Sequence, residues 1–185
     1  IHFFSKIIQK DMKYFFSFIT LIGFVYVFLN GLSKDPRKIP SNLLNQTIPN
    51  FKSINIPSKK PFSKEELLKK DTIKIVNFFA SWCPPCRVEH AQLKNLSNTK
   101  GINLYGIAKK NNHEDLFDFL NELGDPYKAI IDDPTGRVGI SWGVYGLPET
   151  FVIDKSGMIR YKHTGPIMTR DMEQIKSLIN EIKNE

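Results

Sequence analysis

The sequence predicts an α/β domain preceded by one N-terminal transmembrane helix. Three observations lead to this fold class. Residues 14–32 form an uncharged apolar stretch, and the apolar runs 73–79 and 102–108 have the composition of central strands joined by a helix. A hairpin pattern over 150–163 then precedes an amphipathic segment at 169–183. A parallel β-α-β unit joined to an antiparallel hairpin and a closing helix makes a mixed sheet covered by helices.

The composition fits this architecture and excludes several classes of protein. A chain of 185 residues with 41% hydrophobic and 24% charged residues can form a packed core and a solvated surface. It is therefore neither a disordered tail, a collagen-like repeat nor a multi-span membrane protein. The net charge is +7, but the basic residues are scattered among acidic ones. We interpret this excess as a solvated basic surface and not as a nucleic-acid interface.

The N-terminal stretch has the length of a membrane span. Tyr14–Leu32 contains 19 residues without a charge, which corresponds to roughly 28 Å of helix. Lys6, Lys10 and Lys13 precede it, so the positive-inside rule predicts a cytoplasmic segment at 1–13 and places the rest of the chain outside. A cleaved signal peptide is the alternative, but no small-residue cleavage site follows and the apolar stretch is long for a signal core. Residue 1 is Ile, so the sequence leaves open whether it is the true start.

A tether and the first half of the domain follow the predicted anchor. Residues 33–48 are rich in Ser, Asn, Lys and Pro and predict a tether, so the folded domain is expected at 49–185. Alternation predicts a strand at 51–56, and Ser63 is expected to cap a short helix at 63–70 with acidic residues in its first turn. The run 73–79 predicts a central strand buried on both faces.

The second half of the domain alternates helices and strands before the closing hairpin. Periodicity and turn residues predict strands at 102–108 and 127–131 and hairpin strands at 150–153 and 158–163. They predict helices from Cys83 to about residue 96, at 113–123 and, briefly, at 134–140, and Gly124 ends the second of these. A final helix is capped by Thr169 and ends near 183. That helix has one apolar face, made of Met172, Ile175, Leu178, Ile179 and Ile182.

The two cysteines of the chain form a single CxxC motif in ASWCPPC, directly after the predicted central strand. A helix that starts at Cys83 would stabilise a thiolate there through its unpaired N–H groups and its dipole. Cys86 lies one helical turn further on and could resolve a mixed disulfide. Trp82 would shield the sulfur on one side. Pro84 and Pro85 are tolerated because the first helical turn has no N–H partner to lose.

A shared zinc site and a structural disulfide are the alternatives to redox chemistry for this motif. Two cysteines could form half of a zinc site shared between molecules, but alone they cannot supply four ligands. They could also form a structural disulfide, but so short a loop would stabilise the fold weakly. A redox-active dithiol after a strand is typical of the thioredoxin fold. The predicted fold class is therefore thioredoxin-like, with the helix 113–123 and the strand 127–131 as an insertion.

A second element lies about 60 residues further along, in GVYGLPETF at 143–151. A proline before a strand at this distance is where thioredoxin-like proteins carry a cis-proline facing the cysteines. If Leu147–Pro148 is cis, the backbone beside it is expected to be free to pair with an extended substrate. A trans proline in an ordinary turn is the alternative.

The motifs ASWCPPCRVEH (80–90) and GVYGLPETFVID (143–154) closely resemble the membrane-anchored thiol:disulfide oxidoreductases of cytochrome c maturation, the DsbE or CcmG type of the TlpA-like, thioredoxin-like family. The segments DPRKIPS (35–41) and RYKHTGPI (160–167) are also similar, and the resemblance covers essentially the whole chain. It implies a periplasmic reductase on the bacterial inner membrane. Its substrate would be the CxxCH cysteines of apocytochrome c or a partner thiol protein, and a membrane thiol reductase would supply electrons.

The resemblance also implies roles for individual residues. Cys83 matches the nucleophile, Cys86 the resolving thiol and Pro148 the cis-proline. Glu89 and Glu149 match acidic residues near the site. Glu89 could exchange protons with the cysteines, or it could be a solvated carboxylate on the helix surface.

Further positions near the motif were interpreted from the residues themselves. Thioredoxin itself has a buried Asp beneath its cysteines, and here that strand position is Asn77. An amide cannot accept a proton, so any base must be another residue or water. His90 could have a haem or metal role, but surface or helix-capping use is favoured, and His163 is expected to be structural.

We therefore expect a monomeric enzyme with no cofactor beyond its redox-active disulfide and no metal. A general reductase of cell-envelope proteins is one alternative. A peroxiredoxin-like peroxidase is a weaker one, because Ser81 and Trp82 precede Cys83 where that chemistry needs a Thr. A copper metallochaperone is the alternative outside redox enzymes, although the two-residue spacing of the cysteines counts against it.

Overall fold

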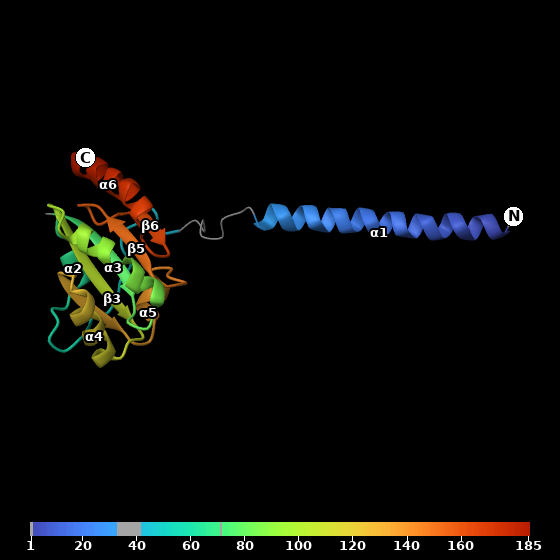
Figure 1. Cartoon of the computed structure of the whole chain (residues 1–185). Coiled ribbons are helices and arrows are strands. Elements are labelled where there is room, and N and C mark those ends of the chain that lie inside the picture. Colours follow the sequence, from blue (N-terminus) through green and yellow to red (C-terminus); the bar gives the residue numbers. More distant parts are fainter. Residues whose placement is uncertain (1, 33–41, 71) are drawn as a thin grey trace. The chain divides into compact units, whose positions relative to one another are not determined.

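The computed structural model describes residues 2–32, 42–70 and 72–185, and the chain divides into two compact units, residues 1–39 and 40–185 (Figure 1). The described part of the first unit is one helix, α1 (His2–Leu32). Within it, Tyr14–Leu32 is long and apolar enough to cross a membrane, and none of this stretch is buried inside the protein. The helix thus has the length and the apolar composition that a membrane span at 14–32 requires.

Two polar side chains of the apolar stretch, Thr20 and Asn30, donate hydrogen bonds to the backbone of the helix itself. The Thr20 hydroxyl donates to the carbonyl of Phe16 at 2.9 Å, and the Asn30 amide donates to the carbonyl of Tyr26 at 3.0 Å. A polar group in lipid is costly unless it is hydrogen-bonded within the protein. These residues are therefore compatible with a hydrocarbon environment.

The second unit is built on a six-stranded mixed sheet with the order β1-β4-β3-β2-β5-β6. Strand β2 runs parallel to β3, and β3 runs parallel to β4, whereas the β1, β5 and β6 pairings are antiparallel. This architecture confirms the predicted thioredoxin-like fold. The strands are β1 (Ile54–Asn55), β2 (Ile73–Phe79), β3 (Ile102–Lys109), β4 (Ala129–Asp133), β5 (Glu149–Ile153) and β6 (Ile159–Thr164).

Helices cover both faces of this sheet, and each face has its own apolar cluster. One cluster packs α3, α4 and α6 on the sheet, and the other packs α2, α5 and the segment that contains Ile48. Every residue of β2 is buried, which is why its sequence is almost continuously apolar. The helices are α2 (Lys64–Leu67), α3 (Pro84–Ser97), α4 (His113–Leu123), α5 (Arg137–Ser141) and α6 (Thr169–Asn184).

The bounds of β2 and α4 are those predicted, and other elements differ in length or position. The strand predicted at 51–56 is reduced to Ile54–Asn55, an edge pairing that ends before Pro57, which has no N–H to donate. The helix predicted at 63–70 covers only Lys64–Leu67. Ser63 occupies its N-cap position without a capping hydrogen bond from its side chain.

Local side-chain hydrogen bonds explain three further shifts. The Asp125 carboxylate accepts the Tyr127 N–H at 3.0 Å, which holds a turn where a strand from 127 was predicted, so β4 begins at Ala129. The Asp133 carboxylate accepts two N–H groups of α5, which begins at 137 and not at 134. Met168, not Thr169, is the N-cap of α6, and its N–H donates to the Asp171 carboxylate at 2.8 Å.

The end of the predicted tether packs on the second unit. Residues 33–41 of the predicted tether lie outside the described residues. Asn45 donates its N–H to the carbonyl of Ile159 at 2.8 Å, and the N–H of Ile159 donates to the carbonyl of Gln46 at 2.9 Å. Ile48 is buried in the second apolar cluster. The folded unit therefore includes residues on the N-terminal side of the predicted boundary at 49.

Gly106 lies in the middle of β3, where the sheet leaves no room for a side chain. A Cβ built there would lie 2.9 Å from the Phe79 ring and 3.0 Å from the Tyr127 ring. These two rings stack with centroids 4.7 Å apart, so neither can easily move. The close approach therefore requires glycine at this position.

We predict that Gly106→Ala lowers the free energy of unfolding by about 1–3 kcal/mol, because the added methyl overpacks a filled site. Thermal unfolding of the oxidised protein in detergent, followed by near-UV circular dichroism, measures this loss. Gly146→Ala is the matched control, since nothing lies within 4 Å of its Cβ position. Equal stabilities of the two variants would contradict the prediction.

Candidate active site

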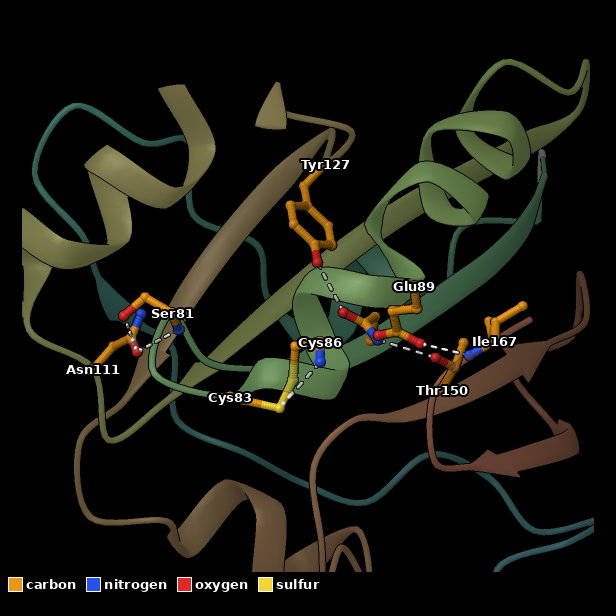
Figure 2. The surroundings of a disulfide bond; sticks show 9 residues. Ser81, Cys83, Cys86, Glu89, Asn111, Tyr127, Thr150 and Ile167 are labelled. Carbon is orange, nitrogen blue, oxygen red and sulfur yellow. Dashed lines mark hydrogen bonds between the residues drawn. A yellow bond between two sulfur atoms is a disulfide. The ribbon is translucent and has the colours of Figure 1, made fainter. Parts of the chain in front are cut away.

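The two cysteines form a disulfide at the amino end of α3, just after the central strand β2 (Figure 2). Cys83 is the N-cap of α3, and the N–H of Cys86 points at its Sγ with an N···S distance of 3.3 Å. Pro84 and Pro85 occupy the first turn. After reduction, the N–H of Cys86 and the helix dipole would favour a thiolate on Cys83.

The loop before Cys83 is held by the loop that follows β3. The Asn111 side-chain oxygen accepts the N–H of Ser81 at 3.0 Å and its hydroxyl at 3.2 Å. The Trp82 indole donates to the carbonyl of Lys110 at 3.0 Å, and the Trp82 side chain remains 59% exposed. Sequence reasoning missed Asn111, because nothing in its local pattern shows that it faces a loop 30 residues earlier.

A groove of about 400 Å³ lies beside the disulfide. The segment from Trp82 to Pro85 lines one part of it, and the segment from Tyr145 to Leu147 lines another. The Leu147–Pro148 peptide bond is cis, and Pro148 itself is buried. Among the described residues, no hydrogen bond is made by the backbone N–H or carbonyl of Leu147. The disulfide and the unpaired backbone groups of Leu147 can therefore both contact the same extended substrate chain.

A buried hydrogen-bond network lies between β2 and α3 on the inner side of the disulfide (Figure 2). The Asn77 amide donates to Glu89 Oε1 at 2.8 Å and to the Thr150 hydroxyl at 3.0 Å. The Tyr127 hydroxyl donates to Asn77 Oδ1 at 2.8 Å. The N–H of Ile167 donates to Glu89 Oε2 at 3.0 Å. The amide at position 77 thus serves as a hydrogen-bonding centre, and the carboxyl group of this network belongs to Glu89.

Burial raises the pKa of Glu89 to about 7, although the hydrogen bonds from Ile167 and Asn77 oppose this effect. The side chain is fully buried, which excludes the solvated carboxylate that the sequence left open. Burial, followed by the nearby charge of Glu89, also holds the pKa of Tyr127 well above its usual value. Glu89 can therefore gain or lose a proton near neutral pH. It lies one helical turn after Cys86, on the same side of α3.

Glu149 is fully buried behind the groove. Its Oε1 accepts the N–H groups of Tyr145 at 3.2 Å and Gly146 at 3.4 Å, and its Oε2 lies 2.8 Å from the Lys162 ammonium. The ammonium also donates to the carbonyl of Gly143 and lies 4.7 Å from the centre of the Tyr145 ring. Glu149 and Lys162 therefore fix the loop that forms one wall of the groove.

The two histidines near the motifs have structural surroundings. His90 is buried, so the surface position is wrong, but its Nε2 lies 2.7 Å from the carbonyl of Gly124, the C-cap of α4, which agrees with the helix-capping use that was also expected. Burial lowers the pKa of His90. His163 is partly buried and bonds weakly to the carbonyl of Pro166. In the part of the chain that the structure describes, no three His, Cys, Asp or Glu residues gather as a metal site would require.

Comparisons with known proteins agree with this geometry. The Redoxin family matches residues 43–179. The chain is 39% identical over 168 residues to a thiol:disulfide interchange protein DsbE homolog of Paracoccus denitrificans, covering 91% of this chain and 89% of the relative. It is 36% identical to DsbE of Escherichia coli K12, covering 84% of each. A DsbE crystal structure from Chlorobium tepidum superimposes with a TM-score of 0.63 at 22% identity, covering 75% of this chain and 96% of that one.

The raised pKa of Glu89 predicts that the folded protein loses stability as the pH rises from about 4.5 to about 7. In this range folded Glu89 keeps a proton that the unfolded chain releases, so the free energy of unfolding falls, by roughly 3 kcal/mol in total from this residue. Denaturant unfolding of the oxidised protein at several pH values should show this fall, and Glu89→Gln should flatten it. Glu173→Gln, on the exposed face of α6, should follow the wild type. If the difference in free energy of unfolding between wild type and Glu89→Gln does not change with pH, the raised pKa of Glu89 is wrong.

Proposed function

Because the chain belongs to the Redoxin family and, within it, to the DsbE-type thiol:disulfide interchange proteins, we propose that it reduces disulfides in cytochrome c biogenesis. The observation that carries this proposal is the Cys83–Cys86 disulfide at the start of α3, beside a groove with an unpaired backbone segment. The substrate is the CxxCH cysteine pair of apocytochrome c or a partner thiol protein.

In the reducing direction, the reaction begins with the dithiol form. The Cys83 thiolate attacks a substrate disulfide, forms a mixed disulfide and releases one substrate thiolate, which takes up a proton. The Cys86 thiolate then attacks the Cys83 sulfur and releases the second substrate thiolate. Two electrons pass to the substrate, and the protein is left as the Cys83–Cys86 disulfide. A membrane thiol reductase must return two electrons before the next turnover.

Glu89 supplies the proton transfer that this sequence needs. Cys86 must lose its proton before it attacks, and the acceptor must be close to it and have a pKa near the working pH. Glu89 follows Cys86 by three residues on α3, and its pKa is about 7. Asn77 fixes the position of this carboxyl group and cannot itself take the proton.

The groove supplies the binding part of the proposal. An extended substrate can pair with the free backbone groups of Leu147 while its disulfide reaches Cys83. The exposed Trp82 and Tyr145 rings border the same groove and offer apolar contact.

The proposed location is the periplasmic face of the bacterial inner membrane. Residues 14–32 would cross the membrane, residues 1–13 would lie in the cytoplasm, and the thioredoxin-like domain would lie outside. The periplasm is oxidising, so a reductase there needs a membrane partner as its source of electrons.

We predict that Cys86→Ser accumulates a mixed disulfide between Cys83 and the natural substrate, because the resolving thiol is gone. Non-reducing electrophoresis of membranes, with mass spectrometry of the trapped species, should identify apocytochrome c or its partner thiol protein. The double variant Cys83→Ser with Cys86→Ser is the matched control and should trap nothing.

Other outcomes of the same trapping experiment favour other functions. A broad range of unrelated envelope proteins would indicate a general reductase. An absence of any trapped species, together with stoichiometric Cu(I) binding by the reduced wild type, would indicate a metallochaperone.

We further predict that the mature protein retains residues 14–32 and leaves the membrane only with detergent. Mass spectrometry of the purified protein gives its N-terminus, and protease added to spheroplasts should digest the domain while a cytoplasmic marker stays intact. A processed N-terminus near residue 33 would show that the stretch is a signal peptide and would overturn the anchor.

A further inference from the structure

Two lysines at the end of β3, Lys109 and Lys110, line the groove beside Cys83. Among the described residues, neither ammonium group has a hydrogen-bond or ion-pair partner. Among the described residues, those that line the groove include no Asp or Glu. The groove therefore carries two positive charges and no negative charge among its lining residues.

The nearest acidic side chains already have partners. The Asp133 carboxylate, on β4 beside Lys109, accepts the N–H groups of Val138 at 3.1 Å and Gly139 at 2.9 Å. Asp132 lies 2.9 Å from His113. Glu149, behind the groove, is paired with Lys162. None of these carboxylates forms an ion pair with Lys109 or Lys110 among the described residues, so both ammonium groups can contact a ligand. Asp133 keeps its negative charge, and its Oδ2 and the Lys109 Nζ both lie beside Gly139, so it offsets part of the Lys109 charge.

The backbone of Lys110 is fixed relative to the reactive loop. Its N–H donates to the carbonyl of Asp133 at 3.0 Å, and its carbonyl accepts the Trp82 indole at 3.0 Å. The Lys109 stem lies over the start of α5, within 3.4 Å of the Cβ positions of Gly136 and Gly139. Both side chains thus leave the backbone at one part of the groove and pass close to the same glycine, Gly136.

We infer that the groove selects disulfide substrates in which an Asp or Glu side chain lies close to the reactive cysteine in an extended segment. This inference rests on the proposed thiol–disulfide exchange and names the substrate class of that site. An extended chain that pairs with Leu147 and presents its sulfur to Cys83 lies in the same groove as both lysines. A carboxylate on that chain gains two attractive contacts, and a cationic side chain there is repelled.

The experiment compares short peptides that differ only beside their cysteine, which is blocked as a mixed disulfide with a chromophoric thiol. The flanking residues are Asp in one peptide, Ser in the second and Lys in the third. The reduced full-length protein in neutral detergent is mixed with each, and release of the thiol gives a second-order rate constant. We expect the Asp peptide to react roughly tenfold or more faster than the Lys peptide at low ionic strength, with the ratio falling in concentrated salt.

Charge variants identify the source of this selectivity. The double variant Lys109→Glu with Lys110→Glu should reverse the order of the Asp and Lys peptides, and Lys109→Gln with Lys110→Gln should bring their ratio close to one. Lys100→Glu with Lys176→Glu makes the same change in net charge at exposed positions outside the groove lining, and it should keep the wild-type ratio. Because both peptides react with the same Cys83, any effect of these charges on the reactivity of Cys83 cancels in the ratio of the two rate constants.

Two results would overturn the inference. One is that the wild type reacts with the Asp and Lys peptides at equal rates. The other is that both double variants at Lys109 and Lys110 keep the wild-type ratio of the Asp rate to the Lys rate. The Ser peptide separates these failures from failure of the proposed function. If it is reduced while the ratio is one, the exchange activity stands and only the selectivity is wrong. If no peptide is reduced, the proposed function fails, and the inference fails with it.

Discussion

A carboxyl group buried between the central strand and the disulfide-bearing helix constrains the rest of the domain. Glu89 is fully buried, and a buried carboxyl is costly unless the surrounding groups hydrogen-bond to it. Asn77 on β2 and the N–H of Ile167 before α6 supply those donors. Asn77 can do so only because Tyr127 and Thr150 complete its own hydrogen bonds. Four separate segments must therefore be in place before α3, and with it the disulfide, has a fixed position.

The outer side of the disulfide is organised by different contacts. Asn111 and the carbonyl of Lys110 hold the loop that contains Ser81 and Trp82. Across the groove, Glu149 holds the backbone of Tyr145 and Gly146. The disulfide thus lies between a satisfied polar network inside and a groove whose walls are fixed from behind. This arrangement places the disulfide beside the backbone of Leu147, which makes no hydrogen bond among the described residues.

Local sequence patterns were sufficient for the elements that carry the disulfide and were insufficient for the contacts that support it. The apolar run at 73–79 and the glycine at 124 mark β2 and the end of α4, because burial and a C-cap residue with a positive φ of 86° leave direct signals in the sequence. The amide at Asn77 also indicated that any base must be elsewhere. Tyr127 and Asn111 were missed because their partners lie 50 and 30 residues away. For His90 the sequence allowed a surface position or a capping role, because nothing nearby shows that α4 ends against its ring.

The proposed chemistry needs the two cysteines to behave differently, and the structure surrounds them differently. Cys83 borders the groove, at a helix N-terminus and in the same groove as two lysines, so its surroundings favour negative charge. Cys86 lies one turn deeper, with Glu89 as the adjacent group that can hold a proton near pH 7. A thiolate is then favoured at the position that attacks the substrate, while the resolving thiol keeps its proton until the mixed disulfide forms. The same positive charges act on the incoming chain, so the features that activate Cys83 also bias which disulfides reach it.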